Sequence, residues 1–457
     1  MLSRVPVVAC VLTLGSLPSL HAGALDPPIV EADVPQPEQV TIEPGYEFGF
    51  LGLGTGVALG VHDAPALSVS SLHPSGVFHS NGQHRQITFS QSAAWTVQDG
   101  PRSFFVEWSG DLSVSRLNTS QRSRLGNGGP VVLSFGSAPD GTIDLNSSSG
   151  PAGAVATADV SLTDNTGGTG TITSSAFSPP GGAITQQAIT TTASGGAFTA
   201  LTTDGTNALS ASYGAIFDAG GFVLSGLGDT QNSEVVIEAT DRITSVRQQI
   251  LGGWQIPTTS DWTITAKVGP TLTVTDRSLS RDEMVEIAPT TNSANGPTIG
   301  LTSRDTVTSS TYGAATQISF SRPLTDAWTG SIGLSAEIGR FDSKYSGYSR
   351  VTAPSLSDGP EIRHRDRLSG ATGRAGLQIG VSRPIALGGV LSLSLYGQRG
   401  FNQPTLRATA LSPITATVSG TGEDASLVST GQQAYRNELT TGSSWSAGAG
   451  VSVAYVF

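Results

Sequence analysis

The residues best suited to metal or acid–base chemistry are four histidines that gather in one short segment. They are His62, His73, His79 and His84, and His364 is the other histidine expected in the mature chain. Imidazoles bind a transition metal when regular structure brings them to one face, and none of these spacings matches a helix or strand ligand pair. Loop histidines are usually only solvated. The sequence therefore predicts no metal site.

Signatures of hydrolases and of cofactor binding are also missing. No Gly-x-Ser-x-Gly motif occurs, and no histidine lies on an expected strand near a serine and an acid. The glycines lie in expected strands or low-complexity loops, so no phosphate-binding loop is followed by a helix. We expect neither an enzyme nor a cofactor. Acids and a histidine in the loops leave a protease open as an alternative, although no spacing favours it.

The last seventeen residues give the clearest structural signal. One face carries Trp445, Ala447, Ala449, Val451, Val453, Tyr455 and Phe457, and the other carries serine and glycine. A period of two over this length predicts a β-strand. An apolar face that ends in aromatics fits a strand with lipid on one side and water on the other.

This ending resembles the C-terminal strand of bacterial outer-membrane β-barrel proteins, including porins. The resemblance is to a superfamily and selects no single family within it. It implies that the chain resides in the outer membrane, in contact with its lipid and lipopolysaccharide. It also implies that the barrel assembly machinery reads Val451, Val453, Tyr455 and Phe457 as an assembly signal.

The N-terminal part of the sequence fits export. Arg4, the apolar run Val5 to Leu17 and Ala22-Gly23-Ala24 predict a cleaved signal peptide at residues 1–24. The only cysteine lies within it, so the mature chain can form no disulfide and no thiol nucleophile. Residues 25–45 are rich in proline and acids and predict an extended periplasmic tether. The formal net charge of −11 disfavours nucleic acid as a partner.

Four hairpins repeat the alternating pattern around short turns. Their turns lie near Asp99–Arg102, Pro257–Asp261, Arg322–Ala327 and Pro384–Gly389. Much longer connections separate the hairpins, namely Arg277 to Arg304, Tyr345 to Arg363, Ala408 to Thr440 and a large one after Asn118. Short turns opposite long loops, with Trp95, Phe104, Trp254, Trp262, Phe320 and Trp328 near the turns, predict a membrane barrel with an aromatic girdle. A soluble β-sandwich is the alternative.

The expected fold is thus all-β, a closed antiparallel transmembrane β-barrel of 10–12 strands with long extracellular loops, spanning residues 46–457. The hairpins, Leu51 to Val61 and the final strand make ten. A candidate hairpin, Ser212 to Phe217 and Phe222 to Leu227, would make twelve, which we favour. A Gly/Ser/Thr-rich insertion occupies about 119–209. Leu125 to Thr240 contains no Lys or Arg in 116 residues. A disordered loop, a β-rich cap and a folded domain remain open for it.

If the apolar faces point to lipid, the opposite faces line the lumen. They carry few charges, of both signs: Glu107, Asp111, Arg247, Lys267, Glu337 and Arg374. Such charges either form ion pairs that fill the lumen or line a narrow aqueous pore. The first strand has a bare inward stripe, Gly52, Gly54, Gly56, Ala58 and Gly60. Either an infolded segment packs against it, or the glycines relieve curvature.

Three alternating arginines, Arg363, Arg365 and Arg367, share the parity of the outward residues Leu377 and Ile379. Above the apolar band they would meet lipopolysaccharide phosphates, which arginine forks bind well. A solvated loop is the alternative.

Function follows less directly than fold. The first hypothesis is a passive or weakly selective channel for small solutes. The second is a structural or adhesion-type surface protein that acts through the acidic extracellular loop and has a closed lumen. An autotransporter-like translocator is disfavoured, because no passenger of useful size precedes the barrel.

Overall fold

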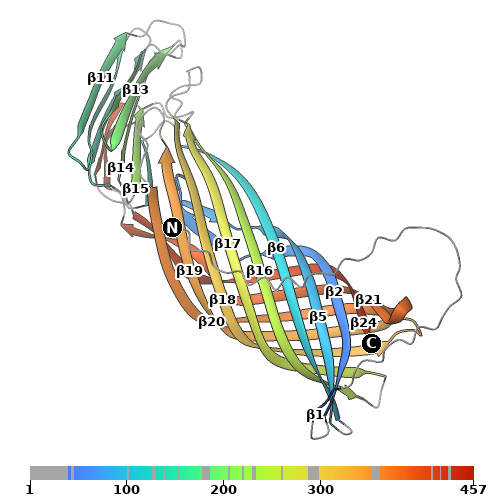
Figure 1. Cartoon of the computed structure of the whole chain (residues 1–457). Helices are drawn as coiled ribbons and strands as arrows, with labels where there is room; N and C mark the ends of the chain where they lie inside the picture. The colour runs from blue at the N-terminus through green and yellow to red at the C-terminus, as the bar shows by residue number, and fades with distance from the viewer. Residues whose placement is uncertain are drawn as a thin grey trace, which may run out of the picture. The chain divides into compact units, whose positions relative to one another are not determined.

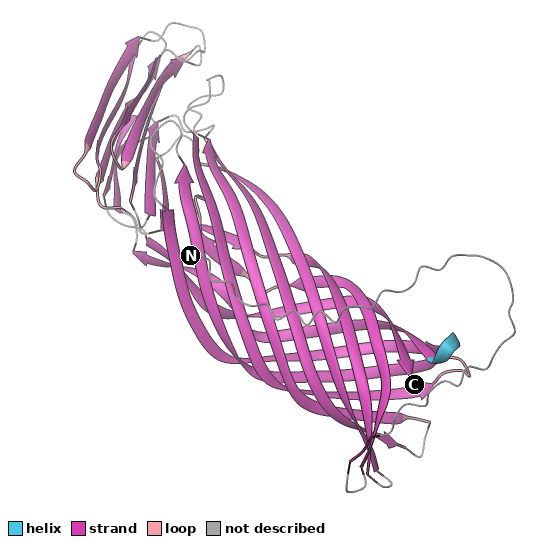
Figure 2. Cartoon of the chain, in the orientation of Figure 1, coloured by secondary structure: helices cyan, strands magenta, loops and turns pink. Residues whose placement is uncertain are grey.

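The computed structural model describes residues 40–42, 46–99, 102–125, 130–136, 139–151, 154–177, 186–203, 206–218, 221–228, 233–258, 261–286, 298–352, 361–412, 415–421, 424–430 and 434–456. The predicted signal peptide, residues 25–39 of the predicted tether and Phe457 lie outside these ranges. Strands make up nearly all of the described chain, and the short turn η1 (Ala386–Gly388) is helical (Figure 2). No described helix is long and apolar enough to cross a membrane.

Ten long strands of the described chain form a ring. They are β2 (Tyr46–Asp63), β5 (Gln83–Asp99), β6 (Arg102–Arg124), β16 (Glu234–Pro257), β17 (Thr263–Glu286), β18 (Thr298–Pro323), β19 (Thr329–Thr352), β20 (Glu361–Pro384), β21 (Gly389–Ser412) and β24 (Ala434–Val456). Their order is β2-β24-β21-β20-β19-β18-β17-β16-β6-β5, and β5 pairs with β2 (Figure 1). All of these pairs are antiparallel. The ring therefore closes as a barrel, which is the arrangement that lipid requires of a sheet.

An apolar band covers the outer face of the barrel. On β19 the outward Ile332, Leu334 and Ile338 are 43%, 52% and 72% exposed, whereas the inward Glu337 is 5% exposed. Val268 on β17 and Ile379 on β20 are exposed in the same way. Large aliphatic side chains exposed on strand after strand fit hydrocarbon far better than water.

The strands extend well beyond this band. About 9–11 tilted residues cross the hydrocarbon, whereas β17, β19 and β20 have 24 residues each. Above the band the outward residues become polar while the alternation continues. Much of Arg277–Arg304 and Tyr345–Arg363, which the sequence suggested were loops, is therefore strand. Those loop boundaries were wrong because outward polarity rises where the wall leaves the membrane.

A second all-β region is built mainly from the insertion. Its five-stranded sheet runs β11 (Thr169–Phe177), β10 (Val155–Thr163), β8 (Thr142–Ser148), β23 (Asp424–Thr430) and β22 (Thr415–Thr421). The other sheet runs β12 (Gln186–Thr191), β13 (Gly195–Thr203), β14 (Asn207–Phe217), β15 (Gly221–Gly228) and β7 (Val131–Gly136), and β9 (Gly150–Pro151) pairs with β14. Apolar side chains between the sheets include Ile143, Val160, Leu162, Ile216 and Leu227. We call this region the β-sandwich.

The preference for twelve barrel strands was wrong. The candidate hairpin at Ser212–Phe217 and Phe222–Leu227 is β14 and β15, which pair with β13 and β7 rather than with the barrel. Both strands are buried on both faces, so an apolar run alone could not assign them to lipid. The insertion is a folded domain, of which the described strands begin at Val131 and end at Gly228. The last long connection adds β22 and β23.

The N-terminal tether also differs in part from its prediction. Val40–Ile42 forms the short strand β1, which pairs antiparallel with Tyr46–Phe48 at the start of β2.

Candidate functional site

Residues 64–82 fold into the barrel rather than out into solvent. This segment, which we call the plug, contains the hairpin of β3 (Leu67–Ser70) and β4 (Val77–Ser80). Its apolar side chains are almost completely buried: Leu67 and Phe78 are 2% and 1% exposed, and Val69 and Leu72 are 0% exposed. They belong to the same buried cluster as the inward Leu279 of β17 and Leu301 of β18. The plug therefore packs on the inner wall of the barrel.

A buried carboxylate fixes the loop of the plug. Glu283 on β17 accepts hydrogen bonds from Ser71 Oγ at 2.8 Å and from the backbone N–H of Leu72 at 2.6 Å. Arg281 donates to Glu283 at 2.5 Å, to Asp305 at 3.2 Å and to the carbonyl oxygen of Ser70 at 2.9 Å. Arg281 and Glu283 are 0% exposed. Charges buried so completely need every partner that they have, so this network binds the plug to the wall.

A second network lies nearer the membrane. Asp241 on β16 receives hydrogen bonds from Arg277 Nη2 at 2.6 Å and from Ser80 Oγ at 3.0 Å, and His84 Nε2 lies 3.2 Å away. Arg277 also donates to the carbonyl oxygen of Pro65 at 2.7 Å. A catalytic triad needs the serine hydroxyl beside the imidazole. Here both groups contact the carboxylate and all are buried, so the cluster is structural.

The plug is also held by the upper ends of β21 and β24. Asn437 accepts a hydrogen bond from Ser70 N at 2.8 Å and donates to Tyr345 OH of β19 at 3.1 Å. Ser68 Oγ accepts from Ala408 N at 3.1 Å. The plug is thus bonded to strands on opposite parts of the ring.

The β-sandwich shares the buried core of the plug. One buried apolar cluster contains residues of the plug together with Val235 and Ile237 of β16. It also contains Leu133 and Phe135 of β7, Phe217 of β14 and Phe222 of β15 in the sandwich. Tyr213 OH of β14 and Ser233 Oγ lie 2.9 Å apart. Apolar contact on this scale is a packed interface rather than a flexible tether. The end of the lumen opposite the short turns is therefore filled by the plug and covered by the sandwich.

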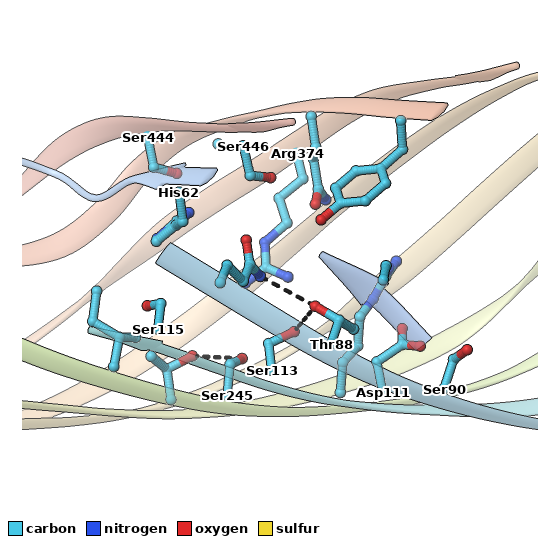
Figure 3. Close-up of a pocket in the computed structure, with 18 of the residues that line it drawn as sticks. His62, Thr88, Ser90, Asp111, Ser113, Ser115, Ser245, Arg374, Ser444 and Ser446 are labelled. Carbon is cyan, nitrogen blue, oxygen red and sulfur yellow. Dashed lines mark hydrogen bonds between the residues drawn. The ribbon is translucent and has the colours of Figure 1, made fainter. Parts of the chain in front are cut away.

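A polar cavity of about 450 Å³ remains in the lumen, bounded on one side by Pro65, His62 and Arg277. Hydroxyl groups dominate its wall, including those of Thr88, Ser90, Ser113, Ser245, Ser444 and Ser446. Arg374, Asp111 and His62 lie among them (Figure 3). Thr88 Oγ1 and Ser113 Oγ are 2.8 Å apart, and Ser245 Oγ and Thr275 Oγ1 are 3.2 Å apart. Such a surface suits water or a small polar solute.

The six charged residues assigned to the lumen from the sequence lie at inward positions. Lys267 Nζ pairs with Glu107 Oε2 at 2.5 Å, and Arg247 Nη2 pairs with Glu337 Oε2 at 2.9 Å. Asp111 lies opposite Arg247 in register, and Glu337 lies opposite Arg374. Four of the six charged residues therefore form ion pairs, and Asp111, Arg247 and Arg374 line the polar cavity. A role in ion selectivity stays a prediction.

The glycine stripe of β2 meets its neighbouring strands and not the plug. A side chain on Gly54 or Gly56 would meet Ser92, Ser452 and Ser90. One on Gly60 would meet the backbone of Ala447 and the hydroxyl of Tyr396. An infolded segment does exist, but it packs elsewhere on the wall.

The histidines are dispersed rather than collected. His73 lies in the plug, with Nε2 3.1 Å from Ser123 Oγ of β6, and the His62 and His84 ring centroids are 6.3 Å apart. Among the described residues, no group of three or more His, Cys, Asp and Glu side chains is placed to hold a metal.

The remaining predicted positions lie on the outer face. Arg363, Arg365 and Arg367 are exposed on alternate residues of β20. Val451 and Tyr455 are 45% and 43% exposed. Val453 shares their parity on β24, and Phe457 lies outside the described residues. Contact with lipopolysaccharide and recognition by the assembly machinery stay predictions.

Sequence reasoning missed the residues that hold the plug. A signal for them existed, because Arg277, Leu279, Arg281 and Glu283 continue the inward parity of Lys267 along β17. Extending the period of two past the apolar band would have placed them inside. Their partners in the plug had no comparable signal.

Comparisons with known proteins leave the family open. No family model and no curated protein matches the sequence. Similar solved structures include the outer membrane protease OmpT from Escherichia coli, at 8% identity and a TM-score of 0.26, covering 89% of this chain and 97% of that chain. The TodX monoaromatic hydrocarbon channel, as a deltaS2 mutant, has 6% identity and a TM-score of 0.18, with 90% of each chain covered. A FadL homologue of Pseudomonas aeruginosa has 10% identity and a TM-score of 0.18, also with 90% of each chain covered. Identities and TM-scores this low transfer no activity to this chain.

Proposed function

We propose that this protein is a bacterial outer-membrane β-barrel with a closed lumen that holds a β-sandwich at the cell surface, as a structural or adhesion-type protein. The observation that carries this proposal is the buried core that the barrel wall and the plug share with β7, β14 and β15 of the sandwich. A display domain held this way keeps a fixed orientation. The apolar outer band and the aromatics near the short turns support the outer membrane as its location.

The plug supports a closed lumen. A solute crossing the barrel would have to displace the plug and separate it from Glu283 and Asp241. Removing partners from a buried charge costs roughly 3–5 kcal/mol. Spontaneous displacement of the plug from the lumen should therefore be rare.

The outer face of the five-stranded sheet is the best candidate for contact with a partner. It carries exposed polar residues on neighbouring strands, namely Asp144, Asn146, Ser161, Thr171 and Thr173. Hydroxyl, amide and carboxylate groups in rows suit a partner rich in hydrogen-bonding groups.

Substitutions on that face test the proposal in the full chain. Cells that display Thr171→Lys/Thr173→Lys protein are expected to lose the surface attachment or aggregation that the wild type gives over cells lacking it. Ser280→Lys/Ser346→Lys, on exposed positions of the barrel extension, is the matched control and is expected to attach normally. Equal attachment by wild-type cells and cells lacking the protein would contradict the proposal.

The cavity favours a second candidate, a gated channel for small polar solutes. About 450 Å³ of hydroxyl-lined space beside Arg374 and Asp111 borders the plug at Pro65. Displacement of the plug and the sandwich cover would connect this space to the outside. This candidate would be favoured over the first if cells took up a small polar solute only when they carry the protein, and if neutralising Arg374 reduced that uptake.

A further inference from the structure

Three arginines line up in register across neighbouring strands on the outer face. Arg116 on β6 lies directly opposite Arg85 on β5, and also directly opposite Arg242 on β16. All three are exposed. Neighbouring strands are roughly 4.8 Å apart, so the three side chains leave the wall within about 10 Å of one another. We call them the arginine row.

The arginine row begins where the apolar band ends. Two residues closer to the membrane along each strand, the outward positions are occupied by Ile87, Val114 and Thr244. Ile87 is 43% exposed on the lipid side. A step of two residues along a strand is roughly 7 Å. The guanidinium groups are therefore at the height where acyl chains give way to head groups.

Within the part of the chain that the structure describes, the arginine row has no counter-charge. No carboxylate in the described part of the chain lies within ion-pairing distance of these three guanidinium groups. Arg116 Nε donates to Asn118 Oδ1 at 3.0 Å, which leaves its two terminal nitrogens for another acceptor. Like charges directly opposite across a sheet are destabilising. In a chain with a net charge of −11, this arrangement needs an external anion.

We propose that the arginine row binds the phosphate groups of lipopolysaccharide at the hydrocarbon boundary of the outer leaflet. Arginine forks match phosphate oxygens in pairs of parallel hydrogen bonds. Three forks in a row span more than one phosphate, which a single arginine cannot. The site is separate from the plug and the sandwich, and it rests on the proposed outer-membrane location.

The site is tested by binding of purified, detergent-folded protein to lipopolysaccharide. Arg85→Gln/Arg116→Gln is expected to weaken binding about 100-fold or more, because it removes two charge-assisted contacts. The control is Arg322→Gln/Arg383→Gln, which removes the same charge at the short-turn end of the barrel. It is expected to bind as the wild type does. Heat-modifiable migration on a gel verifies that each variant is folded.

Two further arms distinguish the chemistry. Dephosphorylated lipopolysaccharide is expected to bind wild type as weakly as intact lipopolysaccharide binds the double variant. Lysine at all three positions keeps the charge without the forks, and is expected to give intermediate binding. Equal binding of wild type and Arg85→Gln/Arg116→Gln would overturn the proposal. So would equal binding of phosphorylated and dephosphorylated lipid, or full displacement of the lipid by equimolar inorganic phosphate.

Discussion

Replacing Glu283 with alanine is expected to loosen the plug while leaving the ring of barrel strands intact. The Glu283 carboxylate holds the plug loop through Ser71 Oγ at 2.8 Å and Leu72 N at 2.6 Å. Glu283→Ala removes both bonds. Arg281 keeps Asp305 at 3.2 Å, so its charge is not left alone. The substitution therefore acts mainly on the plug.

The size of the effect follows from the two bonds. Hydrogen bonds to a charged group are worth about 1.5–3 kcal/mol each, so the plug loses roughly 3–6 kcal/mol of attachment. At about 1.4 kcal/mol per decade, its open population rises by roughly 10²- to 10⁴-fold. The remaining apolar contacts of Leu67, Val69 and Phe78 keep the open form a minority.

Amide hydrogen exchange of the folded protein measures this opening locally. Exchange at residues 67–80 is expected to accelerate by the factor above, with β18 and β19 unchanged below the plug. Asp282→Ala is the matched control, because Asp282 is the adjacent residue, faces outward and accepts a hydrogen bond from Thr302 Oγ1 at 3.0 Å, away from the plug. Unchanged exchange in Glu283→Ala, or equal acceleration in Asp282→Ala, would refute the reasoning.

Three other outcomes follow from the same geometry. Burial of His73, with His79 nearby, lowers the pKa of the His73 imidazole, so protonation opposes the folded plug. Amide exchange at residues 67–80 should therefore accelerate as the pH falls through about 6.5 and below. His73→Gln should abolish this pH dependence. Gly60→Val would place a side chain against the backbone of Ala447 and the hydroxyl of Tyr396, and should destabilise the barrel by about 1–3 kcal/mol. Gly252→Val should not, because the nearest atom to an added Cβ there is 3.9 Å away. Equal heat stability of the two variants would contradict this packing. Burial alone would raise the pKa of Asp164 in the sandwich, but hydrogen bonds from Thr166, Thr192 and Gly168 outweigh burial and lower the pKa. Asp164→Asn should speed amide exchange near residues 164–168 at neutral pH, and the wild type should lose the same protection only as the pH falls below about 4. Equal exchange in the variant and the wild type would show that the charge is not needed.

Local alternation was sufficient to predict the barrel wall. Trp445 to Tyr455 fixed the parity of β24, and the same pattern assigned inward positions to Arg247, Lys267 and Glu337. These features depend on neighbours in one strand or one hairpin, which is the information that period-two patterns carry.

The plug and the sandwich depend on contacts that no local pattern records. Ser71 and Glu283 are 212 residues apart, and the plug has too few residues to show a period of its own. In the sandwich, β14 and β15 are buried on both faces. Their alternation therefore does not separate lipid from a second sheet, and the hairpin was assigned to the wrong structure. Gly, Ser and Thr concealed a folded domain within a composition that also suits disorder.

Bilayer conductance of the purified, folded wild-type protein is the most direct test of a closed barrel. The buried plug, its bonds to Glu283 and Asp241 and the shared core with the sandwich predict a silent membrane at moderate voltage. Stable ohmic steps that change when Glu337 or Arg374 is neutralised would contradict a closed lumen and would identify the protein as a channel.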